Sequence, residues 1–240
     1  MATTDPGSPA LTPIWEVEPL RPRNTARLDR VRIVTVAIGI ADTDGMDAVT
    51  IRRVATDLGS GPMSLYRHLP GGKDDLIDLM LDRVIGEHTL AGIPSGNWAA
   101  DLTVLGEERR AAALRHPWSI IPAARPTLGP NGMRRLEVAL SIFGEEGLPA
   151  ERRAWGVGVL DAYVTGAVGQ ELARHNEQTR TGMSAEDWQR AIEPYISRML
   201  GTGDYPHIAE YVSDAPTVDP AEHFRAGLSA VTTGIVRGLR

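Results

Sequence analysis

The chain has no cysteine and no apolar run long enough to cross a bilayer. Without cysteine it can form no disulfide, no thiolate metal site and no cysteine nucleophile, which fits a reducing compartment. Its apolar runs, such as residues 33–41, stop well short of the roughly 18 residues of a membrane helix. The first fifteen residues lack the basic start and apolar block of a signal peptide. We therefore expect a cytoplasmic protein without a membrane span.

Strand patterns and catalytic motifs are also scarce. Almost no six-residue window alternates apolar with polar side chains, so an all-α fold is predicted. There is no H-E-x-x-H, P-loop or G-x-S-x-G motif, and Gly59-Ser60-Gly61 lacks the preceding strand of a dinucleotide fingerprint. The histidines are scattered singly. We expect neither an enzyme nor a cofactor.

Basic residues are outnumbered overall but gathered in two places. The net charge of −6 does not suit a nonspecific nucleic-acid coat. Residues 50–73 nevertheless contain four basic side chains against Asp57 alone, and residues 21–32 contain five against Asp29 alone. Two basic patches on an acidic body favour selective docking on phosphates.

Residues 50–73 have the spacing of a helix-turn-helix. Ala55 is small enough for two helices to approach, Gly59 suits the positive φ of a tight turn, and Leu65 anchors the second helix. Thr50 is placed to cap the first of these helices. Pro62 fits the first turn of the second, because its missing N–H costs nothing there. The spacing predicts a reading helix over 62–69.

Three regions are expected along the chain. Residues 1–27 hold five prolines and no apolar periodicity, which indicates a flexible arm. Residues 28–90 are predicted to form a head of three short helices and a connector helix that begins at Lys73. Residues 91–240 are predicted to form a helical body for ligand binding and dimerisation, with helices over 98–115, 117–124, 131–146, 150–176, 185–200 and 220–240.

Two helices of the body carry stripes that suggest a dimer. Small residues recur along the long helix, and apolar residues recur at spacings of three and four along the last. Paired with a second subunit, these helices would make a four-helix bundle that presents two heads. The alternative is that both stripes pack inside one monomer. The predicted dimer residues are Gly158, Ala162, Gly166, Phe224, Leu228, Val231 and Ile235.

The chain resembles the TetR family of one-component transcriptional regulators. The resemblance is carried by T-x-R-R-V-A-x-x-L-G at 50–59, M-S-L-Y-R-H-L-P at 63–70 and the K-D-D-L that follows. Further along, R-P-T at 125–127 and A-Y-V-T-G at 162–166 look like a tetracycline-repressor-type effector domain. The pattern is similar to antibiotic-responsive members from actinomycete-like sources. One departure is the second glycine of Pro70-Gly71-Gly72-Lys73.

The resemblance implies that the third helix enters the major groove of DNA. Thr50 would then contact a phosphate, Met63 a thymine methyl, and Ser64 a base edge through a hydrogen bond. Arg52 is the expected base or phosphate contact, and Arg53 the expected salt-bridge partner. The predicted DNA-binding residues are Thr50, Arg52, Ser60, Gly61, Met63, Ser64, Tyr66, Arg67, His68 and Lys73.

Each of these assignments has a plainer alternative. Tyr66 can be a packing residue with its hydroxyl in water, and His68 a surface histidine that ends a helix. In the arm, Arg21, Arg23 and Arg27 are candidates for a narrow minor groove, against the alternative of a solvated tail.

The body is suited to an enclosed, mostly apolar ligand pocket. For any one aromatic side chain, plain core is an equally good interpretation. Glu171 and His175, four apart on one helix, have metal-ligand spacing, but a surface pair is commoner, and no metal is predicted. The predicted pocket residues are Trp118, Arg125, Met133, Phe143, Trp155, Tyr163, Gln170, Glu171 and His175, with Asn131 and Asn176 as further polar candidates.

The resemblance also bears on the effector. The tetracycline repressor uses a histidine just before its R-P-T-like segment, where this chain has Ile121, with Ala124 preceding Arg125. Magnesium-tetracycline is therefore not expected, and a bulky hydrophobic natural product, antibiotic or biosynthetic intermediate is. The predicted function is a dimeric repressor that a small hydrophobic ligand releases from a palindromic operator. The alternatives are a helical ligand-binding or scaffolding dimer without DNA binding, and a ligand-dependent activator.

Overall fold

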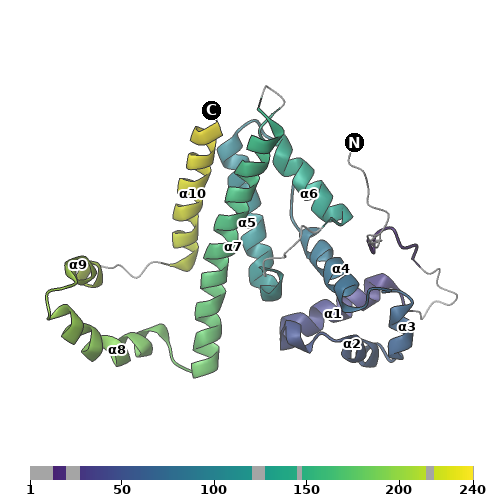
Figure 1. The fold of residues 1–240 in the computed structure, drawn as a ribbon, viewed down its shortest axis with the longest axis horizontal. Coiled ribbons are helices and arrows are strands. Elements are labelled where there is room, and N and C mark those ends of the chain that lie inside the picture. The colour runs from purple at the N-terminus through teal and green to yellow at the C-terminus, as the bar shows by residue number, and fades with distance from the viewer. Residues whose placement is uncertain (1–12, 20–27, 121–127, 145–147, 215–218, 240) are drawn as a thin grey trace, which may run out of the picture.

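A computed structural model describes residues 13–19, 28–120, 128–144, 148–214 and 219–239. Every regular element in these ranges is helical, which confirms the all-α prediction (Figure 1). No helix in the described ranges is both long and apolar enough to span a membrane. The α-helices are α1 (Arg30–Asp44), α2 (Ile51–Asp57), α3 (Pro62–Tyr66), α4 (Lys73–Ile85), α5 (Trp98–Arg115), α6 (Pro130–Ser141), α7 (Ala150–Thr181), α8 (Ala185–Leu200), α9 (Pro206–Asp214) and α10 (Pro220–Leu239).

Helices α1 to α4 pack around one apolar cluster. Ile33, Val54, Leu65, Leu76 and Met80 are completely buried in it, so each of the four helices contributes at least one side chain. Burial of a side chain of this size is worth about 1.5–3 kcal/mol. The short α2 and α3 are thus stabilised chiefly by packing, because isolated helices of this length are marginal in water.

The body is built around α5, α7 and α10, which lie side by side in Figure 1. Leu102, Leu160, Val164 and Leu228 are almost fully buried between them. The approach of α10 to α5 is close, because a Cβ on Gly106 would lie 2.7 Å from a methyl group of Leu228. Helix α6 contacts both α4 and α7, so it connects the head to the body.

Several boundaries differ from the predicted ones. The reading helix α3 ends at Tyr66 and α7 extends to Thr181. The segment expected as a helix over 117–124 is a 3-10 turn over Pro117–Ile120, and its remainder lies outside the described residues. Helix α9 lies between the helices predicted over 185–200 and 220–240 and is not among the predicted elements. In Figure 1, α8 and α9 reach away from the other helices of the body.

Residues 13–19 correct the expectation of a flexible arm over 1–27. Ile14 is 2% exposed, and the carbonyl oxygens of Ile14 and Val17 accept hydrogen bonds from Arg30 Nη1 at 3.3 and 2.7 Å. A buried apolar side chain and a shared guanidinium hold this segment on the head. The prediction was wrong for this segment because proline content carries no information about tertiary partners. Arg21, Arg23 and Arg27 lie outside the described residues.

Candidate DNA-reading head and effector pocket

The turn between α2 and α3 has the geometry that its sequence predicts. Gly59 has φ +63°, a conformation that favours glycine. The N–H of Ser60 returns to the Ala55 carbonyl at 2.8 Å, which closes the turn. Leu65 is completely buried and pins α3 against the core. The Thr50 hydroxyl caps α2 by accepting from the Arg53 N–H at 3.1 Å.

The outer side of α3 is open to solvent. Met63 is 77% exposed and Tyr66 is 45% exposed, although both have large apolar surfaces. Their exposure is unusual for side chains of this size and fits a surface that meets a partner. Arg67 is exposed beside them, while Ser64 is half-buried.

The two adjacent arginines of α2 have different surroundings. Arg53 forms ion pairs with Asp44 and Asp57, both at 3.1 Å, as expected for the structural partner. Arg52 is exposed, and no hydrogen bond or ion pair within the described residues holds its guanidinium. It is therefore available to a phosphate or a base. Lys73 is exposed at the first residue of α4, directly after Gly72, whose φ is +66°.

His68 does not fit its predicted role. Only 6% of this residue is exposed, so its ring is part of the head rather than of the outer surface. Its carbonyl oxygen accepts a hydrogen bond from Arg30 Nε at 3.1 Å, which ties the residue after α3 to α1. We therefore revise the expectation that the imidazole contacts phosphate. The remaining predicted DNA-binding residues, Thr50, Ser60, Gly61, Met63, Ser64, Tyr66, Arg67, Arg52 and Lys73, are all exposed or half-buried.

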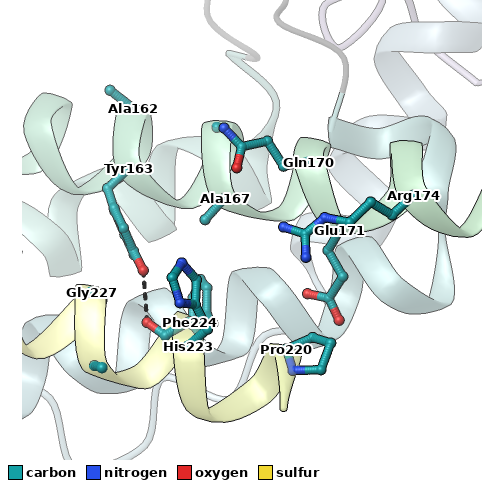
Figure 2. A pocket seen from close by; sticks show the side chains of 12 residues that line it. Ala162, Tyr163, Ala167, Gln170, Glu171, Arg174, Pro220, His223, Phe224 and Gly227 are labelled. Atoms are coloured by element: carbon teal, nitrogen blue, oxygen red, sulfur yellow. Dashed lines mark hydrogen bonds between the residues drawn. The ribbon is translucent and has the colours of Figure 1, made fainter. Parts of the chain in front are cut away.

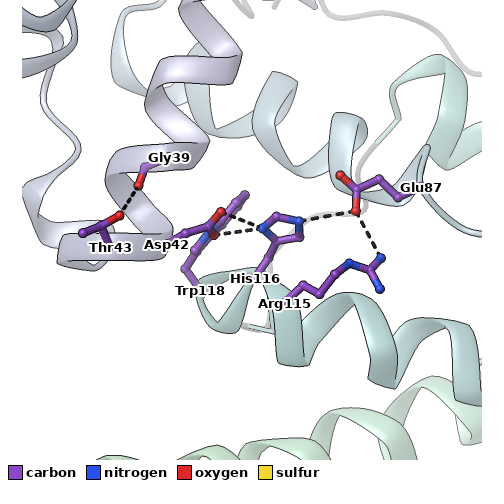
Figure 3. A network of polar contacts seen from close by, with 7 residues as sticks. All are labelled: Gly39, Asp42, Thr43, Glu87, Arg115, His116 and Trp118. Carbon is purple, nitrogen blue, oxygen red and sulfur yellow. Dashed lines mark hydrogen bonds and ion pairs between the residues drawn. The ribbon is translucent and has the colours of Figure 1, made fainter.

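A polar network joins the head to the body at the end of α1 (Figure 3). Asp42 lies within 2.8 Å of His116 Nδ1 and accepts a hydrogen bond from Trp118 Nε1 at 2.7 Å. On its other side, His116 Nε2 lies 3.3 Å from Glu87, which also pairs with Arg115 at 3.1 Å. The end of α5 is therefore linked both to α1 and to the residues that follow α4. No local pattern in the sequence indicates this network.

A cavity of about 410 Å³ opens between α7 and α10 (Figure 2). The Tyr163 hydroxyl donates to the Phe224 carbonyl at 2.7 Å at one side of it, and burial raises the pKa of the Tyr163 phenol. Glu171 pairs with Arg110 through two contacts of 2.8 and 3.1 Å, so its carboxylate is neutralised within the protein. Arg110 also lies 5.1 Å from the centre of the Phe224 ring, a cation–π contact. The wall is mostly apolar, with a few oriented polar groups.

Only part of the predicted pocket set lines this cavity. Tyr163, Gln170 and Glu171 do so, and His175, one turn beyond, does not. Arg125 lies outside the described residues. The α10 side of the wall, which includes His223 and Phe224, is absent from the predicted set, because helical spacing does not say which two helices face each other.

Three aromatic residues and one methionine of the predicted pocket set lie away from the cavity. Trp118 is buried in the head cluster with its N–H on Asp42, and Phe143 is buried against Trp98, with ring centres 5.3 Å apart. Met133 and Trp155 are about half exposed, at 52% and 51%. These side chains serve packing or lie on the surface, and none of them lines the cavity.

The α10 part of the predicted dimer seam is also corrected. Phe224, Leu228 and Ile235 are at most 3% exposed because α5 and α7 of the same chain cover them, and Val231 is half-buried. The heptad-like spacing therefore marks a seam inside the monomer, which was the stated alternative for this helix.

The α7 part of that set lies on the surface. Gly158, Ala162 and Gly166 are exposed, and a Cβ added at either glycine would meet nothing within 4 Å. On α10, the neighbouring exposed residues are equally small: Ala226, Ala230 and Gly234. The two helices together present a surface that another helix pair can approach closely, and Ala162, Gly166 and Ala226 on it also line the cavity between α7 and α10.

A charged cluster occupies the space between α5, α6 and α7. Arg109 and Arg135 both pair with Asp161, at 2.6 and 2.7 Å. Burial raises the pKa of Asp161, but the two arginines lower it by more, so the carboxyl stays ionised. His88 lies near these charges, and its buried Nδ1 has no hydrogen-bond partner among the described residues. Burial, aided by the charge of Arg135, lowers the pKa of His88 to about 4.

An exposed, basic helix-turn-helix on a helical body with a mostly apolar cavity defines a ligand-responsive transcriptional regulator. Residues 90–238 match the family model described as tetracyclin repressor-like, C-terminal domain. The chain belongs to the tetracycline-repressor (TetR) family, whose members bind operator DNA and small molecules and act as dimers. It is a transcriptional repressor of this kind and not an enzyme.

Two of the curated relatives come from actinomycetes. The chain is 37% identical over 216 residues to the HTH-type transcriptional repressor DrrR1 of Streptomyces coeruleorubidus, covering 89% of this chain and 78% of the relative. It is 30% identical over 237 residues to an HTH-type transcriptional regulator of Saccharopolyspora erythraea, covering 97% and 94%.

Among solved structures, apo ActR from Streptomyces coelicolor matches with a TM-score of 0.75 and 29% identity, covering 90% of this chain and 98% of ActR. ActR in complex with actinorhodin matches with a TM-score of 0.73 and 29% identity, covering 89% and 99%. These matches span both the helix-turn-helix and the helical body.

Proposed function

We propose that the protein is a dimeric repressor that reads a palindromic operator with two copies of α3 and releases it when a bulky, largely hydrophobic small molecule binds the body. The observation that carries the proposal is the exposed surface of α3, where Met63 and Tyr66 stand in solvent, together with the exposed Arg52 of α2. The head of residues 28–90 supplies the reading surface, and the body of residues 91–240 supplies the ligand site and the dimer contact.

A dimer is supported by two sets of exposed side chains. The small residues on α7 and α10 allow a second pair of helices to pack closely. Helices α8 and α9 expose large apolar side chains that a second copy would cover. These are Trp188, Tyr195, Ile208, Tyr211 and Val212, between 49% and 73% exposed. Monomeric proteins rarely leave so much apolar surface in water.

The ligand class follows from the cavity. A volume of about 410 Å³ lies within the range of small-molecule sites, roughly 300–1,000 Å³. ActR was solved with actinorhodin and with (S)-DNPA bound, and this supports a small-molecule effector for the present protein. A ligand that binds better when the heads are apart shifts the dimer away from the spacing of successive major grooves, about 34–36 Å.

The experiment is an operator-binding measurement with the full chain on its own upstream intergenic DNA. Arg52→Ala is expected to weaken binding and to reduce the slope of log K against log salt by about 2 per dimer, since each lost phosphate contact removes about 0.9. Arg180→Ala is the matched control, because Arg180 is exposed on α7 and pairs only locally with Glu177. If the two variants bind with the same affinity and salt slope, Arg52 does not contact DNA.

A further inference from the structure

Residues 13–19, which we call the N-terminal strap, are held on the head by the buried Ile14 side chain and by the Arg30 guanidinium. Arg30 Nη1 donates to the carbonyls of Ile14 and Val17, and Arg30 Nε donates to the carbonyl of His68. Arg30 is the first residue of α1, and His68 follows the reading helix α3. One side chain therefore connects the strap, α1 and the end of the reading unit.

The other side of the strap reaches the body. The Trp15 ring packs over Gly129, the residue that precedes α6, with Cη2 2.8 Å from the position of a Cβ there. The Asp82 carboxylate, from α4, occupies the remaining space at Gly129. Asp82 is 5% exposed and accepts from the N–H groups of Asn131 and Gly132 at 3.0 and 2.9 Å. A carboxylate at a helix N-terminus is favourable, so this joint between α4 and α6 is firm.

We propose that the strap is a mechanical link between the start of α6 and the reading helix, with Trp15 as its positioning residue. The inference rests on the proposed function, since it says how a ligand-driven movement of the body reaches the DNA-reading head. When α6 is displaced, Gly129 moves against Trp15 and shifts the strap. The carbonyl groups of Ile14 and Val17 then move with the strap and pull on Arg30. Because Arg30 also binds the carbonyl group of His68, the movement reaches the backbone that follows α3. This route runs beside the covalent one through α4.

Coupling between two sites is reciprocal, so DNA binding at α3 must change the stability of the start of α6. Hydrogen exchange reports such local stability without any effector. The DNA is the duplex that the wild-type protein retains from a random-sequence library at physiological salt. The measurement is amide exchange at residues 130–135, with and without this duplex, in the wild type, Trp15→Ala, Gly129→Ala and Glu16→Ala. Glu16 is exposed in the same strap and serves as the control.

In the wild type and Glu16→Ala, the duplex is expected to slow exchange at residues 130–135 about tenfold. Trp15→Ala removes the ring that contacts Gly129, and it is expected to retain the duplex and to lose most of this slowing. Gly129→Ala also displaces the Asp82 carboxylate, which lies closer to the added Cβ than Trp15 does, so it reports on both contacts together. Unchanged exchange in the wild type, or full slowing in Trp15→Ala, overturns the link while the proposed function stands. If the wild type retains no duplex, the proposed function fails and the link falls with it.

Discussion

The imidazole of His116 lies 2.8 Å from the carboxylate of Asp42, and this contact ties the last turn of α1 to the end of α5. The same carboxylate accepts from the Trp118 indole, so one aspartate satisfies two donors that come from the body. The side chain of His116 is only 12% exposed, whereas those of Asp42 and Glu87 are 29% and 32% exposed, so the network is partly open to water. The head is thus joined to the body by specific polar contacts as well as by the chain itself.

Asp42→Ala is expected to destabilise the protein by about 1–3 kcal/mol, because it leaves the Trp118 N–H and the His116 ring without their acceptor. For a domain of this size, each kcal/mol lowers Tm by about 2–4 °C. The control is Asp57→Ala, which removes only a partner of the exposed Arg53 and is expected to cost about 0.5 kcal/mol or less. Thermal unfolding of both variants checks this. Equal losses in the two would contradict a structural role for the Asp42 network.

His88 is expected to make the protein less stable as the pH falls from about 6.5 to about 4. Its folded pKa of about 4 lies below its usual value of 6.5, so within this window the unfolded chain binds a proton that the folded chain does not. Above the window both forms are neutral, and the contribution to stability is constant. Urea unfolding at several pH values should show a slope that is smaller in His88→Gln. A variant with the wild-type slope would show that other groups cause it.

Ala162→Arg is expected to produce monomers. Ala162 lies on the exposed α7 stripe, where a long charged side chain does not disturb the monomer core but would be buried without a partner at the proposed helix–helix contact. Ala111→Arg, on the exposed side of α5, is the matched substitution and should leave the dimer intact. Sedimentation velocity at micromolar concentration distinguishes the two. A dimeric Ala162→Arg would show that the α7 stripe is not the interface.

Gly227→Ala is expected to reduce ligand affinity at least tenfold. A Cβ at this position overlaps the Tyr163 hydroxyl, so the Tyr163 side chain must shift in the cavity wall and its hydrogen bond to the Phe224 carbonyl is weakened. Gly234→Ala, on the same helix, meets nothing within 4 Å and provides the control. Fluorescence titration with a bulky, largely hydrophobic ligand that the wild type binds measures both. Wild-type affinity in Gly227→Ala, with a clear signal in the control, would place the ligand elsewhere.

The reading unit could be predicted because its signals are local. Gly59 and Leu65 fall within one short stretch, and each fulfils in the structure the role that its residue type allows. The spacing of Phe224, Leu228 and Ile235 correctly indicated a buried face. It could not indicate whether the partner helix belonged to the same chain, and the predicted intersubunit position was wrong for these three residues.

The links between head and body could not be predicted. His116 and Asp42 are 74 residues apart, and Arg30 meets Val17 through a carbonyl oxygen that every residue type carries. Neither contact produces a periodic pattern or a motif. Burial of His68 was missed for the same reason, since a polar residue at the end of a short helix usually lies in water.

The most direct test of the account is the pattern of the DNA that the protein selects. A library of random duplexes, retained by the full-length protein at physiological salt and sequenced, reports both base preference and symmetry. Two copies of α3 in one dimer predict two inverted half-sites whose centres are about 10–10.5 bp apart, or a multiple of one helical turn. Selection of a single unsymmetric site, or of no duplex at all, would contradict a dimeric DNA-reading repressor.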